Sequence, residues 1–328
     1  MSHLYPLKFK PIIKDKIWGG NKLKTILDKK TATDKSGESW EISAIEDNIS
    51  IISNGFLKGN NLQEAIEIYM GDIVGDKVFE KFGVEFPLLI KFIDATDDLS
   101  IQVHPDDKLA MERHNAYGKT EMWYVLQADK DSELIIGFNK NINKETLINS
   151  IENNTLIEYL NIEKVKTGDV FYLPAGRVHA IKKGILLAEI QQTSDITYRL
   201  YDWNRPDEKG NFRELHVDLA LDAIDFKISK KCKTEYNSIP DFSSTIIKSD
   251  FFTTNIINLK KSITLNYSLL DSFVVLMCLE GSFKIIDEYD LTTKVTKGET
   301  ILLPAVLESI NLTANSSAKL LEVYIDLK

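Results

Sequence analysis

Three short segments of this 328-residue chain carry side chains of the kinds that bind metal ions and move protons. Gln102 and His104 lie two residues apart, so on a β-strand both side chains point to the same face. Lys119 and Glu121 have the same spacing and would also share a face. His179 ends a segment that consists of a glycine turn, a short apolar run and a proline. The spacing therefore predicts a polar site built from three separate strands or turns.

Two imidazoles, one carboxylate and one amide oxygen form a suitable donor set for zinc or a similar divalent ion. His and Gln are neutral and Glu121 contributes one negative charge, so a bound divalent ion would keep a net charge of about +1. Such an ion remains a good Lewis acid toward a carbonyl or enediolate oxygen. Gln102 is the weakest donor and could instead support another ligand. The donor types do not separate zinc from manganese, iron or cobalt.

The elements that must position these residues are mostly strands. Short apolar runs bounded by Gly, Pro, Asp or Asn predict strands at 86–94, 122–126, 170–173, 185–190, 196–201, 273–279, 300–303 and 320–325. Helical patterns are fewer and cover 62–70, 106–115, 144–160 and 215–224. The polar stretch at 233–244, which contains Pro240, predicts a domain boundary.

One internal similarity suggests that a β-fold occurs twice. Residues 164–175 resemble residues 294–305 at a constant offset (294 − 164 = 130), and each copy has a glycine turn, a short strand and a proline. Ser309 stands where the first copy has His179. If the repeat is real, only the first copy keeps the polar groups for chemistry.

The segment that ends in His179 matches a known motif. It fits the second cupin motif, G-x5-P-x-G-x2-H, at Gly168, Pro174, Gly176 and His179, and departs from the longer pattern at Lys183, where asparagine is usual. In this match the segment resembles the cupin superfamily, which implies a β-sandwich or jelly-roll fold.

The first cupin motif, H-x-H followed by Glu, is altered in a way that resembles one family. Here it reads Gln102-x-His104, and Glu121 follows after a longer insertion. That pattern is similar to type I phosphomannose isomerases of the short bacterial form. Further phrases resemble the same family over roughly residues 5–206: Trp18-Gly19-Gly20, residues 38–43, residues 100–105, residues 118–121 and residues 194–199.

The resemblance implies a mainly β fold with two cupin-type β-sandwich or jelly-roll units and inserted helices. It implies a catalytic cupin domain with inserted helices at 1–235 and a degenerate cupin-like β domain at 236–328.

The resemblance also implies an activity and a set of site residues. The activity would be a metal-dependent aldose–ketose isomerisation of mannose 6-phosphate and fructose 6-phosphate through a cis-enediol(ate), with one zinc ion per chain. The implied metal ligands are Gln102, His104, Glu121 and His179; the catalytic residues are Arg199 and Lys119; the substrate-binding residues are Ser100, Asp195, Trp18 and Trp40.

Several of these roles stay open at this point. Lys119 is a candidate base, and Arg199 could either neutralise the enediolate or hold the phosphate. Trp18 and Trp40 could form the pocket wall or pack in the core, and Asp195 could cap a turn. We read the remaining histidines, which have no such context, as surface or packing residues: His3, His114 and His216. Arg177 could contact a phosphate or be a charge on a loop, and we favour the loop charge.

Composition narrows the function classes. A net charge of −9 and a pI near 5.2 count against a nucleic-acid binder. Two cysteines without CxxC spacing exclude a disulfide scaffold and a cysteine-based zinc site. No signal peptide is visible, and the longest apolar run, 273–279, is far shorter than the ~20 residues of a membrane span. We expect a cytoplasmic monomer or homodimer that binds a sugar phosphate, with no membrane or nucleic-acid partner.

Two other function classes remain. One is a different cupin enzyme, such as an iron oxygenase or a cupin-type glucose-6-phosphate isomerase. Gln102 and the Lys119-x-Glu121 phrase argue against an oxygenase, which favours two histidines and one carboxylate. The other is a non-catalytic sugar-binding cupin, which would be expected to carry a helix-turn-helix or to have lost ligands.

Overall fold

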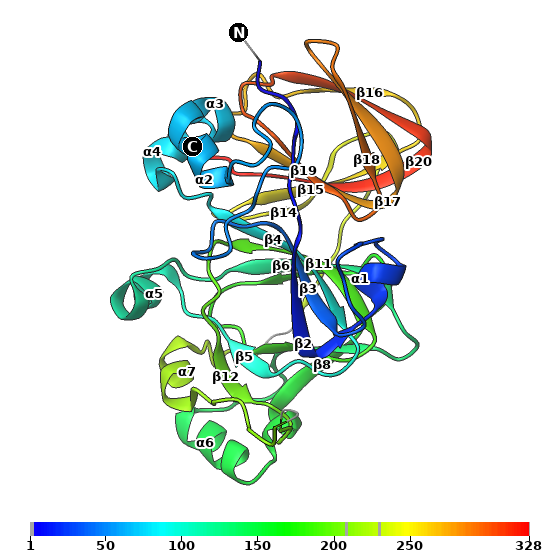
Figure 1. Cartoon of the computed structure of the whole chain (residues 1–328). Helices are drawn as coiled ribbons and strands as arrows, with labels where there is room; N and C mark the ends of the chain where they lie inside the picture. Colours follow the sequence, from blue (N-terminus) through cyan, green and yellow to red (C-terminus); the bar gives the residue numbers. More distant parts are fainter. Residues whose placement is uncertain (1–2, 207–208, 229–230, 328) are drawn as a thin grey trace.

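The chain is built from antiparallel β-sheets arranged in an upper and a lower half (Figure 1). The computed structural model describes residues 3–206, 209–228 and 231–327. The mainly β architecture that the sequence predicted is therefore confirmed.

The lower half holds two sheets. The first has the strand order β13 (Lys233–Thr234), β9 (Val170–Leu173), β6 (Glu121–Ala128), β11 (Ile185–Gln192), β4 (Leu88–Ala95), β3 (Ser36–Ile42) and β2 (Ile12–Gly20). The second has the order β12 (Tyr198–Tyr201), β5 (Ile101–Val103), β10 (His179–Ile181), β7 (Glu133–Phe138) and β8 (Leu160–Lys164). Side chains of both sheets, such as Trp123 and Phe171 from the first and Ile136 and Ile181 from the second, form one buried cluster. This shared core fixes the distance between the sheets that carry the polar site.

The upper half is a single sheet of eight strands. Its main order is β1 (Leu7–Lys8), β19 (Thr300–Leu303), β17 (Val274–Asp287), β20 (Ser309–Tyr324), β15 (Thr253–Leu259) and β14 (Ser244–Lys248), with β16 (Ile263–Asn266) paired to β20 and β18 (Thr292–Thr296) paired to β17. The first strand of the chain therefore belongs to the C-terminal sheet. The domain boundary between residues 235 and 236 stays a prediction.

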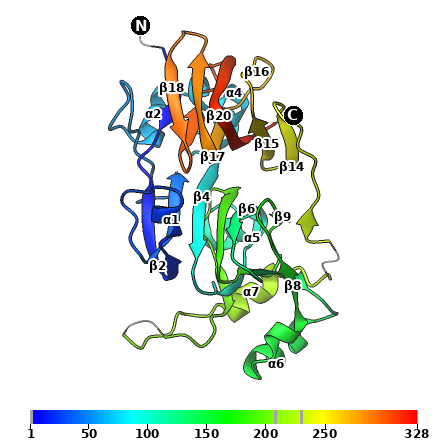
Figure 2. The same ribbon diagram turned by 90° about the vertical axis from the view of Figure 1, so that its right-hand side faces the viewer.

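Short helices lie at the edges of these sheets (Figure 2). They are α1 (Lys22–Thr25), α2 (Leu62–Tyr69), α3 (Gly71–Val74), α4 (Asp76–Phe82), α5 (Asp107–His114), α6 (Lys144–Glu152), a 3₁₀ turn (Leu156–Tyr159) and α7 (Val217–Ala223). The region of α2 to α4 packs on the upper sheet, where the Phe273 amide donates to the Val74 carbonyl at 3.1 Å. A single helix over 144–160 is a wrong prediction, because the helix ends at Glu152 and Asn154 adopts a positive φ of 57°.

The internal repeat appears as the same turn and strand in both halves. β9 and β19 cover the two equivalent segments, and β10 and β20 begin at His179 and Ser309. Gly168 and Gly298 both have positive φ, 90° and 82°, a conformation that side chains other than glycine rarely adopt. Their amides donate to Val125 and Cys278, in both cases at 2.8 Å. The two halves therefore share one cupin-type plan.

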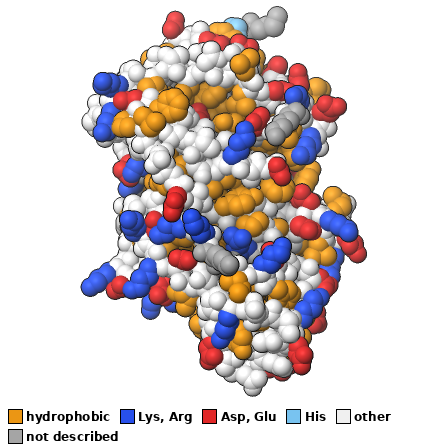
Figure 3. All heavy atoms as spheres, turned by 180° about the vertical axis from the view of Figure 1, so that it is seen from behind, with side chains coloured by type: hydrophobic (Ala, Val, Ile, Leu, Met, Phe, Trp, Pro, Cys, Tyr) orange, Lys and Arg blue, Asp and Glu red, His pale blue; other side chains and the backbone are white. Residues whose placement is uncertain are grey.

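No helix among the described residues is long and apolar enough to cross a membrane. Seen from behind, basic and acidic side chains are interspersed over both halves of the molecule (Figure 3). This face thus lacks the broad positive field that a general nucleic-acid binder uses.

Candidate active site

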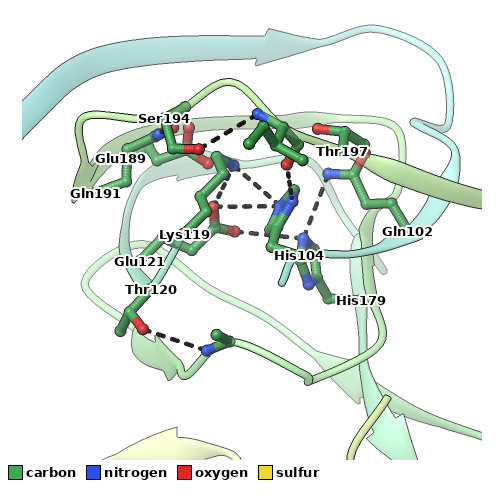
Figure 4. Close-up of polar contacts among 12 residues, drawn as sticks. Gln102, His104, Lys119, Thr120, Glu121, His179, Glu189, Gln191, Ser194 and Thr197 are labelled. Carbon is green, nitrogen blue, oxygen red and sulfur yellow. Dashed lines mark hydrogen bonds and ion pairs between the residues drawn. The ribbon is translucent and has the colours of Figure 1, made fainter. Parts of the chain in front are cut away.

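Three of the predicted metal ligands meet in the lower half, between its two sheets (Figure 4). His104 follows β5, Glu121 opens β6 and His179 opens β10. Their ligand atoms lie within 4.8 Å of one another, and the three side chains are only 1–2% exposed. Nε2 of His179 is 3.3 Å from Oε1 of Glu121, and Nε2 of His104 is 3.6 Å from Oε2. The sequence prediction that these residues form one site is consistent with this geometry.

Both imidazoles are held by backbone carbonyls. Nδ1 of His104 is 2.8 Å from the Ile196 carbonyl, and Nδ1 of His179 is 2.8 Å from the Arg177 carbonyl. A carbonyl only accepts, so Nδ1 donates in each ring and the Nε2 lone pair faces Glu121. Burial, together with the charge of Lys119, lowers the pKa of His179 to about 4 and holds the pKa of His104 well below its usual value. Both rings are therefore neutral near pH 7, and each has an Nε2 lone pair that can bind a metal ion.

Gln102 lies at the edge of the same group. It pairs with His179 across β5 and β10, and its Nε2 is 3.3 Å from Nε2 of His179. Its Oε1 accepts from the Ser100 hydroxyl at 3.4 Å. A half-turn of the amide would exchange the two atoms and turn the oxygen toward His179. The residue is thus placed for either of the roles that the sequence left open.

Lys119 supplies a positive charge at this point. Its Nζ is 2.5 Å from Oε2 of Glu121 and 3.0 Å from Nε2 of His104. The side chain is 5% exposed, which makes this a buried ion pair. Oε1 of Glu121 is buried and has no hydrogen-bond partner among the described residues. Burial raises the pKa of Glu121, and Lys119 opposes that rise.

These features fit a divalent cation. Two neutral imidazole nitrogens and a carboxylate face a common point, one carboxylate oxygen lacks a partner, and a lysine ammonium already interacts with two of the donors. A buried carboxylate oxygen without a partner carries a cost that a bound cation would remove. His104, Glu121 and His179 would hold the ion, with Gln102 in reach as a fourth donor.

A cavity of about 320 Å³ opens beside the donor set. Seven of the ten residues predicted for the site line it: Trp18, Trp40, Ser100, Gln102, Lys119, Asp195 and Arg199. The other three, His104, Glu121 and His179, are the buried candidate metal ligands, which contact Lys119 and Gln102. Trp18 and Trp40 are also largely buried, at 3% and 6% exposure, so they combine pocket wall and core. The volume suits a hexose phosphate.

Two arginines line the cavity, one of which the sequence analysis did not single out. Arg199 donates from Nη1 to the Glu214 carbonyl at 2.8 Å, whereas its Nε is buried and lacks a partner among the described residues. Burial lowers the pKa of Arg199, and the positive charge of Arg213 adds to this effect. Arg213 in turn donates from Nε to Asp202 at 2.6 Å. Two like charges at one cavity wall favour an anionic ligand between them.

The sequence analysis also missed a buried ionic group in the cavity wall. Lys91 on β4 donates to Oε1 of Glu189 on β11 at 3.0 Å and to Oε1 of Gln191 at 2.7 Å. Trp123 Nε1 donates to the other oxygen of Glu189 at 2.8 Å. Although burial opposes the charge of Lys91, the carboxylates of Glu189 and Glu38 raise its pKa. The sequence did contain a signal for this ionic group, because Lys91 stands inside an apolar strand and a buried charge requires a partner or a ligand.

The strand register identifies the residues of the upper half that correspond to the four predicted ligands. His179 pairs with Gln102 and Glu121 with Leu173 in the lower half. The equivalent pairs in the upper half are Ser309 with Asn266 and Leu303 with Val274. By this register the upper-half residues that replace Gln102, His104, Glu121 and His179 are Asn266, Ser268, Val274 and Ser309. The upper half thus keeps the plan of the fold without the predicted metal-binding residues.

The remaining histidines lie on the surface and make local contacts, since His3 and His114 are exposed and His216 is half-buried. His3 stacks on Tyr289 with ring centroids 3.9 Å apart, and His114 Nε2 is 2.7 Å from the Tyr198 hydroxyl. His216 accepts from the backbone amide of Arg199 at 3.2 Å. None of them lines the cavity.

Comparison with known proteins agrees with this arrangement. Residues 6–140 match the family model for the catalytic domain of type I phosphomannose isomerase. The chain is 39% identical to mannose-6-phosphate isomerase ManA of Bacillus subtilis over 306 residues, which cover 91% of this chain and 93% of the relative. It is 35% identical to mannose-6-phosphate isomerase of Streptococcus mutans, over 93% of this chain and 94% of the relative.

A solved structure shows the same fold. The crystal structure of mannose 6-phosphate isomerase from Bacillus subtilis superposes with a TM-score of 0.88 at 31% identity, over 98% of this chain and all of that one. This chain belongs to the type I phosphomannose isomerase family.

Proposed function

We propose that this chain is a metal-dependent aldose–ketose isomerase that interconverts mannose 6-phosphate and fructose 6-phosphate. The observation that carries the proposal is the His104–Glu121–His179 donor set beside Lys119, at a cavity with two arginines in its wall. The names of the relatives indicate the substrate. We further propose zinc as the ion, one per chain. The cytoplasmic location and the monomeric or dimeric state remain predictions from the sequence.

When bound, a divalent ion would act as a Lewis acid toward the oxygens on which negative charge develops during the isomerisation. The chain prepares that site in advance, because the backbone carbonyls of Ile196 and Arg177 fix the two imidazoles. Glu189 and Lys91, which neutralise each other in the wall, keep the cavity polar without adding a net charge.

Lys119 is proposed as the residue that moves the proton between C1 and C2 of the open-chain sugar. It both lines the cavity and contacts two proposed ligands, so its Nζ lies next to the place where the reacting carbons would sit. As the neutral amine, a lysine takes the proton from C2 and, as the ammonium so formed, returns it to C1 from the same nitrogen, which suits a transfer between neighbouring carbons of one substrate.

Arg199 and Arg213 are proposed to hold the phosphate. Replacing Arg213 with alanine should raise the KM for mannose 6-phosphate by about tenfold to a hundredfold and lower kcat much less. A hydrogen bond to a charged group is worth about 1.5–3 kcal/mol, and a factor of ten corresponds to about 1.4 kcal/mol. Steady-state kinetics check this, together with inhibition by inorganic phosphate, which should weaken in parallel.

The matched control for this prediction is Arg113→Ala, which removes an arginine that also pairs with an aspartate, Asp222, and that does not line the cavity. The control should leave KM within about twofold of the native value. An Arg199→Ala variant with full turnover at native KM would rule out a substrate role for Arg199.

A coupled assay tests the proposed reaction itself. Purified protein is supplied with mannose 6-phosphate, and fructose 6-phosphate is measured before chelation, after chelation and after zinc is restored. We expect activity to disappear with the chelator and to return with zinc. A folded protein that is inactive with zinc, manganese, iron and cobalt would contradict the proposed reaction. Activity that survives complete metal removal would contradict the metal requirement.

A further inference from the structure

A second cavity lies where the two halves of the molecule meet. It has a volume of about 540 Å³ and shares no lining residue with the active-site cavity. Its walls come from the β1–β2 connection and the segment after α1 in the lower half, and from the turn between β18 and β19 in the upper half. Figure 1 shows α1 below the strand β17. Gly298 of the upper half approaches Leu27 so closely that a Cβ there would lie 2.4 Å from the Leu27 carbonyl oxygen.

The charges around this cavity do not balance. Five lysines line it, and only three carboxylates do. Each of those carboxylates already pairs with a lysine of the same cavity: Glu299 with Lys8 at 2.7 Å, Glu41 with Lys29 at 2.6 Å, and Asp28 with Lys30 at 2.5 Å.

Two lysines remain beyond those pairs. Lys10, in the β1–β2 connection that links the two halves, and Lys297, in the upper half, form no ion pair with any side chain in the described part of the chain. The cavity therefore has an excess of two positive charges in a protein whose net charge is −9. An excess of this kind in a hollow attracts anions, because the low-dielectric walls focus the field.

A buried hydroxyl points to the same conclusion. Thr300 on β19 lines the cavity, is 6% exposed, and its Oγ1 has no hydrogen-bond partner among the described residues. A buried hydroxyl without a partner is costly and is normally satisfied by another group. Thr31, Ser53 and Thr296 also line this space, and the Thr296 hydroxyl already donates to Glu299 at 3.0 Å. Hydroxyl donors next to unpaired ammonium groups are the groups that recognise phosphate oxygens.

We propose that this cavity between the two halves binds a small phosphorylated anion, with Lys10 and Lys297 neutralising the phosphate and Thr300 donating to one of its oxygens. The volume leaves room for a sugar-sized group on the phosphate. Because Lys297 belongs to the upper half and Lys10 to the connection that leads into the lower half, a bound anion would tie the halves together. This site is independent of the isomerase reaction proposed above.

The cavity is also coupled to the active site through β3. Trp40 and Glu41 are neighbours on that strand and point to opposite faces, Trp40 to the active-site cavity and Glu41 to this one. The β1–β2 connection, which includes Lys10, leads directly into the strand that carries Lys16 and Trp18. A ligand in this cavity would therefore restrain two strands of the active-site wall.

The test is the binding of inorganic phosphate to the metal-loaded enzyme, measured by isothermal titration calorimetry and by the rise in Tm with phosphate. The cavity variant is Lys10→Ala/Lys297→Ala. Its control is Lys166→Ala/Lys284→Ala, which removes the same charge from two exposed lysines outside both cavities. We expect the cavity variant to lose one phosphate site, or to bind there at least about tenfold more weakly, while the control matches the native protein.

Thr300→Val gives a second and independent readout. Without phosphate this variant should be at least as stable as the native protein, because it removes an unpaired buried hydroxyl and keeps the side-chain shape. With phosphate its Tm should rise less than that of the native protein. Because phosphate also stabilises proteins in general, and sulfate would enter the same site, sodium chloride at equal ionic strength and the Lys166→Ala/Lys284→Ala variant serve as the controls for nonspecific salt effects.

The outcomes separate the two proposals. Phosphate isotherms that coincide for the native protein and the cavity variant would overturn the anion site. Loss of a site in the cavity variant, with persistence of that site in Arg199→Ala, would support it. Absence of isomerase activity in the coupled assay would overturn the proposed reaction and would leave the phosphate measurement unaffected.

Discussion

Replacing Glu121 with glutamine should yield a protein that retains almost no divalent metal and almost no isomerase activity. Glu121 is the one charged donor in the proposed set, and both imidazoles approach its carboxylate, at 3.3 Å and 3.6 Å. Lewis-acid stabilisation is worth several kcal/mol, and each 1.36 kcal/mol is a factor of ten, so kcat/KM should fall about a thousandfold. Metal analysis by mass spectrometry and the coupled assay check the two parts of this prediction.

The same substitution disturbs a buried ion pair, and this effect must be separated from metal loss. Without the carboxylate, the Lys119 ammonium stays buried beside His104 with no counter-charge, which costs about 3–5 kcal/mol. A Glu121→Gln/Lys119→Met double variant removes both charges and should recover most of the lost Tm. It should recover neither metal nor activity.

A buried glutamate in the upper half supplies the matched control. Glu322 is 2% exposed and accepts hydrogen bonds from Tyr267 at 2.6 Å and Asn255 at 2.7 Å. Glu322→Gln should lower Tm and leave metal content unchanged. Native metal content in Glu121→Gln would remove Glu121 from the proposed ligand set.

The sequence predicted the fold best where glycine and proline mark the ends of a strand. The bounds of β9 and β19 agree with the predicted 170–173 and 300–303, because a positive-φ glycine precedes each strand and a proline follows it. The β2–β3 hairpin was not predicted. β2 carries three consecutive charged residues, Lys14, Asp15 and Lys16, and most of its side chains are half-buried. Its sequence therefore lacks the alternation of apolar and polar residues that identifies a strand. Its position depends on pairing with β3, which is a tertiary contact.

The proposed ligand set could be predicted from the sequence because each of its residues lies within a few positions of a recognisable turn or strand. Gln102 and His104 need only the two-residue period of a strand to share a face. The wall residues Lys91 and Glu189 are 98 positions apart and meet only through the register of β4 and β11. Arg213 comes from outside any regular element, so no period marks it. Short-range spacing was thus enough to predict the proposed metal donors, whereas the residues that line the cavity could be identified only from the fold.

Replacing Lys119 with methionine should separate metal binding from turnover. The loss of a general acid–base group should lower kcat by about a hundredfold to ten-thousandfold. The affinity for zinc should stay the same or increase, because the ammonium at 2.5 Å from Glu121 and 3.0 Å from His104 competes with a cation for both donors. Zinc titration against a competing chelator, with the coupled assay on the zinc-loaded protein, measures both quantities.

The control for this variant is Lys182→Met, which breaks a Lys–Glu pair of similar length, 2.6 Å to Glu133, on a partly exposed surface away from the cavity. It should keep native kcat and zinc affinity.

If Lys119→Met lost zinc and activity in parallel, the lysine would act by supporting the ligands, and another group would have to carry the proton. If the variant retained zinc but had a reduced kcat, the proton transfer would be assigned to Lys119. The bound ion would then be shown to be insufficient for catalysis without the lysine. Opposite shifts in affinity and turnover cannot arise from a general loss of folding, which lowers both.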